Sequence, residues 1–454
     1  MVRAAISKRK RPFDGQCAEG ASNCHCRLNN LVELILNMTS SDVLTLAQQS
    51  RLAARQLAPA SEKQRNLALA TMAEALESVR SQVLAVNAEE VAKARDAGQT
   101  DAMVKRLTID DKMFDYMLSR LKKVAQLPDP LNRILTGHTN PAGLRVYKKS
   151  VPLGVIGMIY ESRPNVTTDA AGVCIKSGNA VILRGGSEAL QTNLMLTDAM
   201  IEGAVAAGLP RHAIQILRTP GHEAVGELLQ MDQYIDVLIP RGGKSLIKRI
   251  AEGTRIPVIK HYDGICHLYL AADAEPDKAL ALALNSKCQS VQVCNALETL
   301  LVDAECADQL LPKLHKAFTA NGIELRGCGL TLKLLSDIAA ATEEDWSTEY
   351  LAPILSVKIV DGIQAAIDHI NHYGSGHTDG IVTQSLNLAR QFEEQVDSAS
   401  VMINASTRLS GGGDYGLGSV VGISTDKLHV RGPVGPDGLT TYKWVAVGDG
   451  HLRE

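Results

Sequence analysis

At Ala180-Val181-Ile182-Leu183-Arg184-Gly185-Gly186-Ser187 the chain passes from an apolar run directly into a glycine turn. Four consecutive apolar residues bounded by turn residues are typical of a strand that is buried on both faces. The following segment, Gln191 to Ala207, has the length of a helix and ends at a Gly-Leu-Pro turn, and a further strand is expected at Ile214 to Leu217. Because strands that alternate with helices form parallel units, this stretch predicts an α/β fold with a parallel sheet.

The same alternation extends in both directions along the chain. Helices are expected from Ser41 to about Leu127, and an edge strand or hairpin arm at Leu144 to Lys149. A second α/β unit is expected to begin near Asp277. Further buried strands are predicted at Val155–Tyr160, Val237–Ile239, Val258–Lys260, Thr299–Val302, Ile354–Ile359, Gly380–Val382 and Ser400–Ile403. The pattern therefore predicts two α/β domains with sheets rich in parallel strands.

Composition excludes several classes of protein. The chain has 454 residues, a formal net charge of −3 and 9 dispersed cysteines. A nearly neutral chain argues against a nucleic-acid binder, and no apolar run is long enough to predict a membrane span. Dispersed cysteines in a large chain indicate reduced thiols in a cytoplasmic protein rather than a disulfide framework. Cys24 and Cys26 have the wrong spacing for a zinc knuckle, so no metal site is expected.

Cys294 lies between an expected helix and an expected strand. A thiolate is a strong nucleophile, and its pKa falls near a helix N-terminus or a cation. Taken alone, however, a cysteine flanked by valines is more often a small buried apolar side chain. Both interpretations stay open on these residues.

Several other segments, taken in chain order together with the cysteine segment, decide between these interpretations. They are Pro152–Gly157 with Glu161–Val166, Lys176–Glu188, Cys294–Ala296 with Glu298–Val302, Glu349–Pro353, His369–Asp379, Asn404–Arg408 and His429–Gly435. Together they resemble the motifs of the gamma-glutamyl phosphate reductases, a branch of the aldehyde dehydrogenase superfamily. The resemblance covers the chain from about Met38 to its end and implies an aldehyde dehydrogenase-like fold.

The resemblance implies NADPH-dependent reduction of L-glutamyl 5-phosphate to L-glutamate 5-semialdehyde, with release of phosphate, as the second step of proline biosynthesis from glutamate. Cys294 would attack the acyl carbon and form a thioester, with Asn295 beside it in the same motif. Arg163 would stabilise the oxyanion or hold the leaving phosphate. A surface arginine before a proline is the alternative interpretation of Arg163.

The resemblance also assigns the cofactor site. Glycine turns after strands let a nucleotide approach the backbone, and an arginine with a serine suits the 2′-phosphate of NADP. The two turns and the helix start that follows the second one would hold the nucleotide, and Glu349 would bind the nicotinamide ribose unless it is merely solvated. The expected cofactor residues are Arg184, Gly185, Gly186, Ser187, Glu188, Gly242, Gly243 and Glu349.

Substrate recognition requires donors for a carboxylate and an acceptor for an ammonium group. The expected residues are Asn404, Ser406, Thr407 and Arg408, with the loop 411–414, although glycine-rich loops are often only flexible. His377 and Asp379 either take part in substrate binding or act only as structural hydrogen-bond partners. Cys288 is a candidate for an inactivating disulfide with Cys294.

One substitution bears on the direction of the reaction. Hydrolytic aldehyde dehydrogenases carry a glutamate that activates water, and this chain has His261 at that position. Loss of the glutamate fits a reductase, which should not hydrolyse its thioester. His261 itself is equally a proton carrier or a structural cap.

The resulting domain prediction has four parts. Residues 1–37 would be a disordered leader or a misplaced start, 38–273 an NADP-binding domain with 139–150 in an oligomerisation flap, 274–402 a catalytic cysteine domain, and 403–454 a return to the cofactor domain with a strand that pairs with a neighbouring subunit. A homo-oligomer is expected, with a glutamate 5-kinase as a transient partner. The alternatives are another acyl reductase of the superfamily or an inactive relative.

Overall fold

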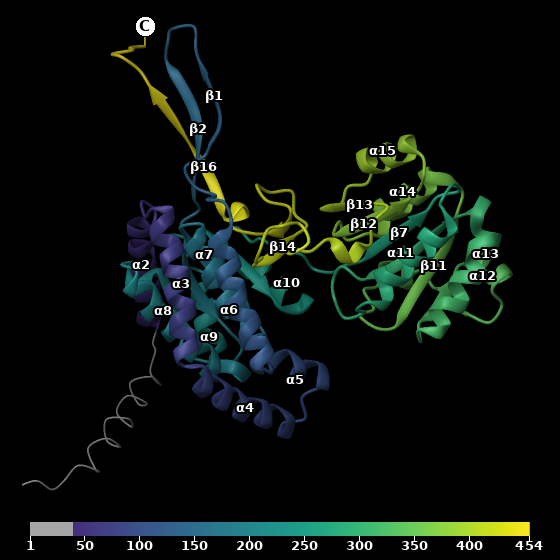
Figure 1. Cartoon of the computed structure of the whole chain (residues 1–454), viewed down its shortest axis with the longest axis horizontal. Helices are drawn as coiled ribbons and strands as arrows, with labels where there is room; N and C mark the ends of the chain where they lie inside the picture. Colours follow the sequence, from purple (N-terminus) through teal and green to yellow (C-terminus); the bar gives the residue numbers. More distant parts are fainter. Residues whose placement is uncertain (1–39, 454) are drawn as a thin grey trace, which may run out of the picture.

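The computed structural model describes residues 40–453, which form two α/β domains and a projecting antiparallel arm (Figure 1). The α/β class expected from the sequence is confirmed. The expected leader, residues 1–37, lies outside the described residues. No helix in the described range is long and apolar enough to cross a membrane.

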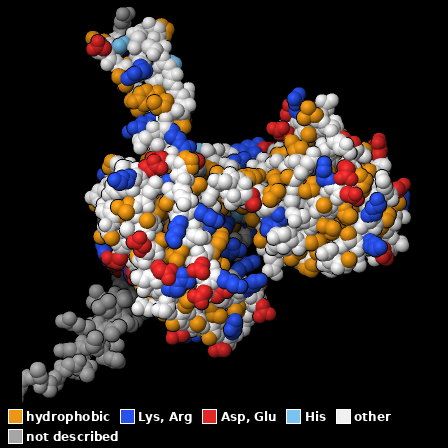
Figure 2. Space-filling model, viewed as in Figure 1, with side chains coloured by type: hydrophobic (Ala, Val, Ile, Leu, Met, Phe, Trp, Pro, Cys, Tyr) orange, Lys and Arg blue, Asp and Glu red, His pale blue; other side chains and the backbone are white. Residues whose placement is uncertain are grey.

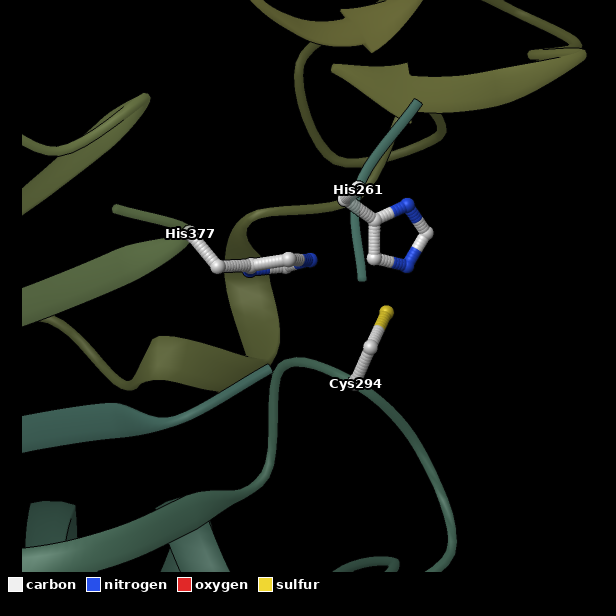
Figure 3. A group of neighbouring side chains, drawn as sticks. All are labelled: His261, Cys294 and His377. Atoms are coloured by element: carbon white, nitrogen blue, oxygen red, sulfur yellow. The ribbon is translucent and has the colours of Figure 1, made fainter. Parts of the chain in front are cut away.

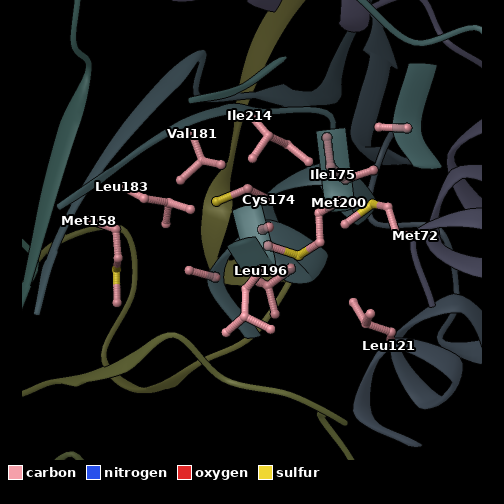
Figure 4. Packing of buried hydrophobic residues seen from close by; sticks show 14 of the residues in the cluster. Met72, Leu121, Met158, Cys174, Ile175, Val181, Leu183, Leu196, Met200 and Ile214 are labelled. Atoms are coloured by element: carbon pink, nitrogen blue, oxygen red, sulfur yellow. The ribbon is translucent and has the colours of Figure 1, made fainter. Parts of the chain in front are cut away.

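The first domain is built on a four-stranded parallel sheet in the order β5-β4-β3-β6. Its strands are β3 (Val155–Tyr160), β4 (Ala180–Arg184), β5 (Ile214–Ile216) and β6 (Val237–Arg241). Side chains of β4 alternate between the two faces, as strand geometry requires. Val181 and Leu183 join the larger core, part of which is drawn in Figure 4, whereas Ala180 and Ile182 join the core on the opposite face.

Helices cover both faces of this sheet. The larger core is lined by α3 (Glu62–Ser78), α6 (Asp111–Gln126), α7 (Asn165–Lys176) and α8 (Leu190–Ala206), and the other by α2 (Ser40–Leu57), α9 (His222–Leu228) and α10 (Lys244–Gly253). The helices α4 (Arg80–Asp96) and α5 (Asp101–Leu107) form a smaller cluster beside them. The expected strand at Val258–Lys260 is wrong, because Val258 makes only a single bridge to Leu238. The neighbouring Pro257 has no N–H with which to extend the pairing.

The second domain is built on a seven-stranded parallel sheet in the order β10-β9-β11-β8-β7-β12-β13. Its strands are β7 (Cys266–Leu270), β8 (Leu297–Asp303), β9 (Glu324–Gly327), β10 (Ala339–Ala340), β11 (Ile354–Val360), β12 (Thr378–Val382) and β13 (Ser400–Ile403). One face packs on α11 (Pro276–Cys288) and α12 (Ala304–Ala320), and the other on α14 (Gly362–Tyr373) and α15 (Leu386–Gln395); the short helix α13 (Gly329–Leu334) follows β9.

The change from one sheet to the other comes earlier than the expected boundary at residue 274. Strand β7 pairs with β8 and β12, so it belongs to the second domain. A buried apolar run such as Cys266–Leu270 has the same pattern in either sheet, and the sequence does not identify its pairing partners.

The arm is a three-stranded antiparallel sheet in the order β1-β2-β16. It consists of β1 (Ile134–Thr139), β2 (Arg145–Pro152) and β16 (Thr440–Val447), so it begins before residue 139. Strand β16, expected to pair with a neighbouring subunit, pairs with β2 of its own chain. The chain reaches β16 through β14 (Gly422–Ser424) and β15 (Gly432–Val434), which lie next to the first domain (Figure 1).

Candidate active site

Cys294 lies in the loop between α11 and β8, immediately before the first residues of the seven-stranded sheet. His377 directly precedes β12 in the same sheet, and parallel strands begin at one common edge, so both residues lie at the amino edge. His261 approaches from the segment that joins the two domains. The Cys294 Sγ and one ring nitrogen of each histidine all lie within 4.8 Å of one another, around one small space (Figure 3).

The backbone of the cysteine loop is tightly held. A Cβ on Gly264 would lie 1.8 Å from the carbonyl oxygen of Cys294, so only glycine fits this position. The Gly264 N–H donates to Glu349 Oε1 at 2.9 Å, and the Cys266 thiol donates to the Cys294 carbonyl at 3.2 Å. Burial raises the pKa of Cys266 well above its usual value, so this thiol stays protonated and keeps donating.

Both imidazoles present a lone pair to the thiol. His261 Nδ1 lies 3.2 Å from the carbonyl oxygen of Ile423, which only accepts, so Nδ1 is the donor and, in the neutral ring, Nε2 is the nitrogen with the lone pair. His377 Nδ1 lies 2.8 Å from Thr378 Oγ1, which donates to Ser410, and Ser410 donates to a carbonyl. This chain of donors gives His377 the same tautomer.

His377 is held in its neutral form. Its side chain is 1% exposed, and this burial lowers its pKa to about 4, against the opposing effect of Asp379 and Glu349. Its Nε2 is buried and has no hydrogen-bond partner among the described residues. A neutral imidazole with an unpaired nitrogen therefore faces Cys294.

Asn295 and Arg408 are brought together next to the cysteine. The Arg408 Nη1 donates to Asn295 Oδ1, Asn295 Nδ2 donates to the Arg408 carbonyl at 3.2 Å, and Arg408 Nε donates to Gln289 Oε1 at 2.9 Å. Burial lowers the pKa of Arg408, and the charges of Cys294 and Asp414 oppose that change. The site thus has a fixed guanidinium beside the nucleophile.

The other expected substrate residues differ in position. Ser406 and Thr407 are buried, with Ser286 bonded to both, and they support the Arg408 turn. Asn404, whose φ is 52°, bonds in both directions to the backbone of Thr383. Thr383 follows the last residue of β12, so Asn404 lies at the opposite edge of the sheet from Cys294. The structure does not bring Asn404 to the site.

Arg163 approaches Cys294 from the first domain. Its side chain keeps contact with solvent, yet the surrounding protein lowers its pKa to about 10, with Arg241 and Arg106 contributing and Cys294 opposing. Three guanidinium groups therefore share this side of the site. Figure 2 shows basic side chains bordering the hollow between the two domains.

The first expected cofactor turn is packed against its own domain. Arg184 ends β4 and donates to the Pro220 carbonyl at 3.1 Å. Glu188 accepts from the Ser162 N–H at 2.6 Å and its hydroxyl at 2.8 Å, which ties this turn to the loop that carries Arg163. A Cβ on Gly185 would lie 2.2 Å from Asn193, and one on Gly186 would lie 2.2 Å from the Glu188 carboxylate. A side chain at either position would therefore force Asn193 or Glu188 to move. Ser187 starts the short 3₁₀ turn Ser187–Ala189.

The second cofactor turn contains a carboxylate that the sequence did not reveal. Gly243 precedes α10, and its N–H donates to Glu161 Oε2 at 3.1 Å. A Cβ on Gly242 would lie 2.4 Å from the same oxygen. Glu161 therefore occupies the position at the helix N-terminus where a pyrophosphate was expected, and an incoming anion would have to displace it.

Glu349 lies beside the cysteine loop, as the hydrogen bond from Gly264 shows. Burial raises its pKa, and the Gly264 N–H acts in the opposite direction. Two further acids are structural. Asp379 accepts from both the N–H and Nδ1 of His267 at 2.8 Å, and the Glu298 carboxylate forms a fully buried ion pair with Lys287 at 2.6 Å.

Cys288 and Cys294 are both free thiols. Cys288 packs against the apolar core of the second domain, and burial raises its pKa, with Lys287 opposing. The proposed disulfide between these cysteines is not formed in this structure.

Comparison with known proteins agrees with this geometry. The sequence profile of the aldehyde dehydrogenase family matches residues 24–324 and 335–416. The chain therefore belongs to the aldehyde dehydrogenase family, whose members use a nicotinamide cofactor.

Within the family, the expected resemblance to gamma-glutamyl phosphate reductases is confirmed. The enzyme of that name from Thermotoga maritima is 38% identical, with a TM-score of 0.89, and the match covers 91% of this chain and 100% of that one. The enzyme from Saccharomyces cerevisiae is 30% identical, with a TM-score of 0.50 and coverage of 92% and 100%. An acetylating aldehyde dehydrogenase from Geobacillus thermoglucosidasius, 19% identical with a TM-score of 0.64 over 91% of this chain and 98% of that one, shares the fold.

Proposed function

We propose that this protein reduces L-glutamyl 5-phosphate to L-glutamate 5-semialdehyde with NADPH and releases phosphate, the second step of proline biosynthesis. The observation that carries the proposal is that Arg408, hydrogen-bonded to Asn295 next to the cysteine, and Arg163 of the other domain both feel the charge of Cys294. The acyl phosphate has a carboxylate at one end and a phosphate at the other, and two guanidinium groups from two domains near the nucleophile suit both.

In the proposed first step, the Cys294 sulfur bonds to the acyl carbon, and the bond from that carbon to the phosphate oxygen breaks. The thiol proton passes to His261, whose Nε2 faces the sulfur without a proton of its own. Arg163, with Arg241 and Arg106 behind it, stabilises the charge that accumulates on the leaving phosphate. The product is a thioester on Cys294 and free phosphate.

In the proposed second step, the hydride that reduces the thioester would come from NADPH when it is bound. Arg184 and Ser187 would hold the 2′-phosphate, Gly242 and Gly243 the pyrophosphate, and Glu349 the nicotinamide ribose. Preference for NADP over NAD rests on Arg184. The N–H of Cys294 or the Arg163 guanidinium would donate to the tetrahedral oxyanion before the aldehyde leaves and the thiolate is restored.

Arg408 and Asp414 would select the amino acid end of the substrate. The guanidinium suits the α-carboxylate, and Asp414, whose charge acts on Arg408, suits the α-ammonium. Ser406 and Thr407 contribute by fixing the turn that carries Arg408.

The test runs the reaction in reverse, with purified protein, glutamate semialdehyde, phosphate and NADP, and follows nicotinamide absorbance. We expect phosphate-dependent reduction of NADP that is lost in Cys294→Ala and kept in the matched control Cys288→Ala. Reduction without phosphate would identify an ordinary dehydrogenase, and reduction that requires coenzyme A in place of phosphate would identify an acyl-CoA reductase. Either result would overturn the proposal.

We also propose that the arm serves assembly of a homo-oligomer, as is usual in this family. The arm exposes apolar side chains, and such patches mark interaction surfaces. They are Ile134, Leu135, Tyr442 and Trp444. A transient complex with a glutamate 5-kinase, and a cytoplasmic location, stay predictions.

A further inference from the structure

We propose that Cys294, His261 and His377 form a binding site for a zinc ion, and that zinc bound there holds the enzyme in a reversibly inhibited state. No metal has a place in the reaction proposed above. The site is suggested by the convergence of one sulfur and two ring nitrogens, all within 4.8 Å of one another, from three separate segments of the chain (Figure 3).

The donor set is one that zinc prefers. Thiolate sulfur and imidazole nitrogen are its usual ligands, at about 2.3 Å and about 2.0–2.1 Å, so ligand atoms around a tetrahedral ion lie about 3.5 Å apart. Contraction of the present cluster by roughly 1 Å reaches that geometry, and small rotations of the side chains are sufficient. Hard cations such as Mg²⁺ and Ca²⁺ prefer oxygen ligands and do not fit.

The hydrogen bonds behind the two imidazoles already have the arrangement found around zinc. Zinc-bound histidines donate their second ring N–H to a protein oxygen, which fixes the tautomer and aims the lone pair at the metal. His261 donates to the Ile423 carbonyl, and His377 donates to Thr378 Oγ1. Both Nε2 lone pairs therefore already face the thiol, and only the distances between the ligand atoms have to shorten.

The second independent observation is the unpaired Nε2 of His377. A buried ring nitrogen that lacks a partner costs free energy, and in native proteins such atoms usually have a partner in water or an ion. This nitrogen is buried and unpaired within the described part of the chain, and its ring points into the space beside Cys294. The neutral state that burial imposes on His377 is also the state that coordinates metal.

Three protein ligands leave the fourth position of the ion for water. Binding converts the Cys294 thiol into a zinc-bound thiolate and releases one proton, and no bond to carbon and no change of oxidation state is involved. The sulfur lone pair that would attack the substrate is then bound to zinc. Arg408 and Arg163 repel a cation, so we expect weaker binding than in a closed structural zinc site.

The experiment measures metal binding directly. The full-length, reduced protein is titrated with Co²⁺, whose bond to a thiolate gives a charge-transfer band in the near ultraviolet, and Zn²⁺ is then added to displace it. We expect a band at one equivalent for wild type and for Cys288→Ala, and its loss in Cys294→Ser. His377→Asn and His261→Asn should each weaken binding at least about tenfold, the scale of losing one ligand or its support.

Cys24 and Cys26 offer another pair of thiols, so the titration is repeated with both replaced by serine. A band that disappears with these two residues, or that persists in Cys294→Ser, overturns the proposal, as does unchanged affinity in both histidine variants. If His377→Asn fails to fold, His261→Asn still tests the site, because His261 is only half-buried and its replacement should disturb the fold less. Melting curves of each variant without metal complete the control.

Inhibition is a separate readout, and it rests on the proposed function. Zinc should abolish phosphate-dependent NADP reduction by wild type, and a chelator should restore it. A cobalt band at Cys294 in a protein without reductase activity would refute the proposed function and leave the zinc site intact. An active reductase that gives no cobalt band would refute the zinc site and leave the proposed function intact.

Discussion

Replacement of Gly264 by alanine should show how accurately the nucleophile has to be placed. The new Cβ would stand 1.8 Å from the Cys294 carbonyl oxygen and 2.7 Å from its Cα, whereas such contacts in proteins stay above 3.0 Å. One of the two backbones must therefore move by about 1.2 Å or more, since protein interiors are close-packed. A misplacement of about 1 Å costs roughly 100-fold in turnover. We thus expect Gly264→Ala to lower kcat by about that factor.

The assay compares kcat for phosphate-dependent NADP reduction with the rate at which iodoacetamide alkylates Cys294. The matched control is Gly329→Ala, because apart from its chain neighbours and the backbone of its own helix, nothing in the described residues lies within 4 Å of a Cβ at that position. Overpacking costs about 1–3 kcal/mol of stability, so a melting curve must show that the variant is folded. A folded Gly264→Ala protein with the kcat of wild type would refute the argument that this contact positions the cysteine.

Other expected outcomes concern the substrate, the buried ion pair and acid stability. Arg408→Lys should lose the two-pronged guanidinium contact with the substrate α-carboxylate, which is worth about 1.5–3 kcal/mol. This should lower kcat/KM for the semialdehyde roughly 10- to 100-fold while the KM for NADP stays near that of wild type; an equal rise in both KM values would contradict this. Lys287→Met should cost about 3–5 kcal/mol in urea unfolding, because the buried Glu298, whose pKa burial raises to about 7, loses the cation that it is paired with, and Lys287→Met with Glu298→Gln should recover part of the loss; a single variant as stable as wild type would be the contrary result. Burial, with His267 and Lys358 nearby, lowers the pKa of His369 to about 3 in the folded protein. As pH falls below about 6.5, the imidazole therefore takes up a proton in the unfolded chain while it stays neutral in the folded one. The unfolding free energy should therefore decrease as the pH is lowered from about 6.5 to 3, by about 1.4 kcal/mol per pH unit for one proton. His369→Phe should reduce this slope by the contribution of one proton; an unchanged slope would assign the acid sensitivity to other groups.

Much of the fold follows from the sequence because buried parallel strands are continuous apolar runs. The run at Ala180–Leu183 predicts β4 for this reason, and its alternate side chains serve two cores. Pairing partners are not encoded locally, so Cys266–Leu270 was assigned to the first domain although it pairs in the second. The strand expected at Val258–Lys260 is likewise wrong, since the apolar pattern outweighs the effect of Pro257 and only a single bridge forms.

The candidate site was predictable where one motif supplies neighbouring atoms. Asn295 lies next to Cys294, and Arg408 reaches it through the turn that Ser406 supports. Asn404 belongs to the same motif, yet its positive φ reverses the chain and leaves it at the far edge of the sheet.

Contacts between distant segments were beyond the sequence. His261 and His377 meet only after β7 and β12 have paired, and nothing in either segment indicates that the two rings share Cys294. Glu161 and Gly264 act by close approach to a backbone, which is a property of the folded chain. A missing Cβ is visible in the sequence, but the atom that it makes room for is not.

The route of the chain through the first domain has a consequence for biosynthesis. Its core includes Val434 and Leu439, and β16 completes the arm only near the end of the chain. The seven-stranded sheet, in contrast, is formed by one continuous segment from Cys266 to Ile403. On a ribosome, domains fold as their residues emerge, so the second domain can finish while the first, made earlier, still lacks its last strands. The half of the protein that is synthesised first is therefore the half that is completed last.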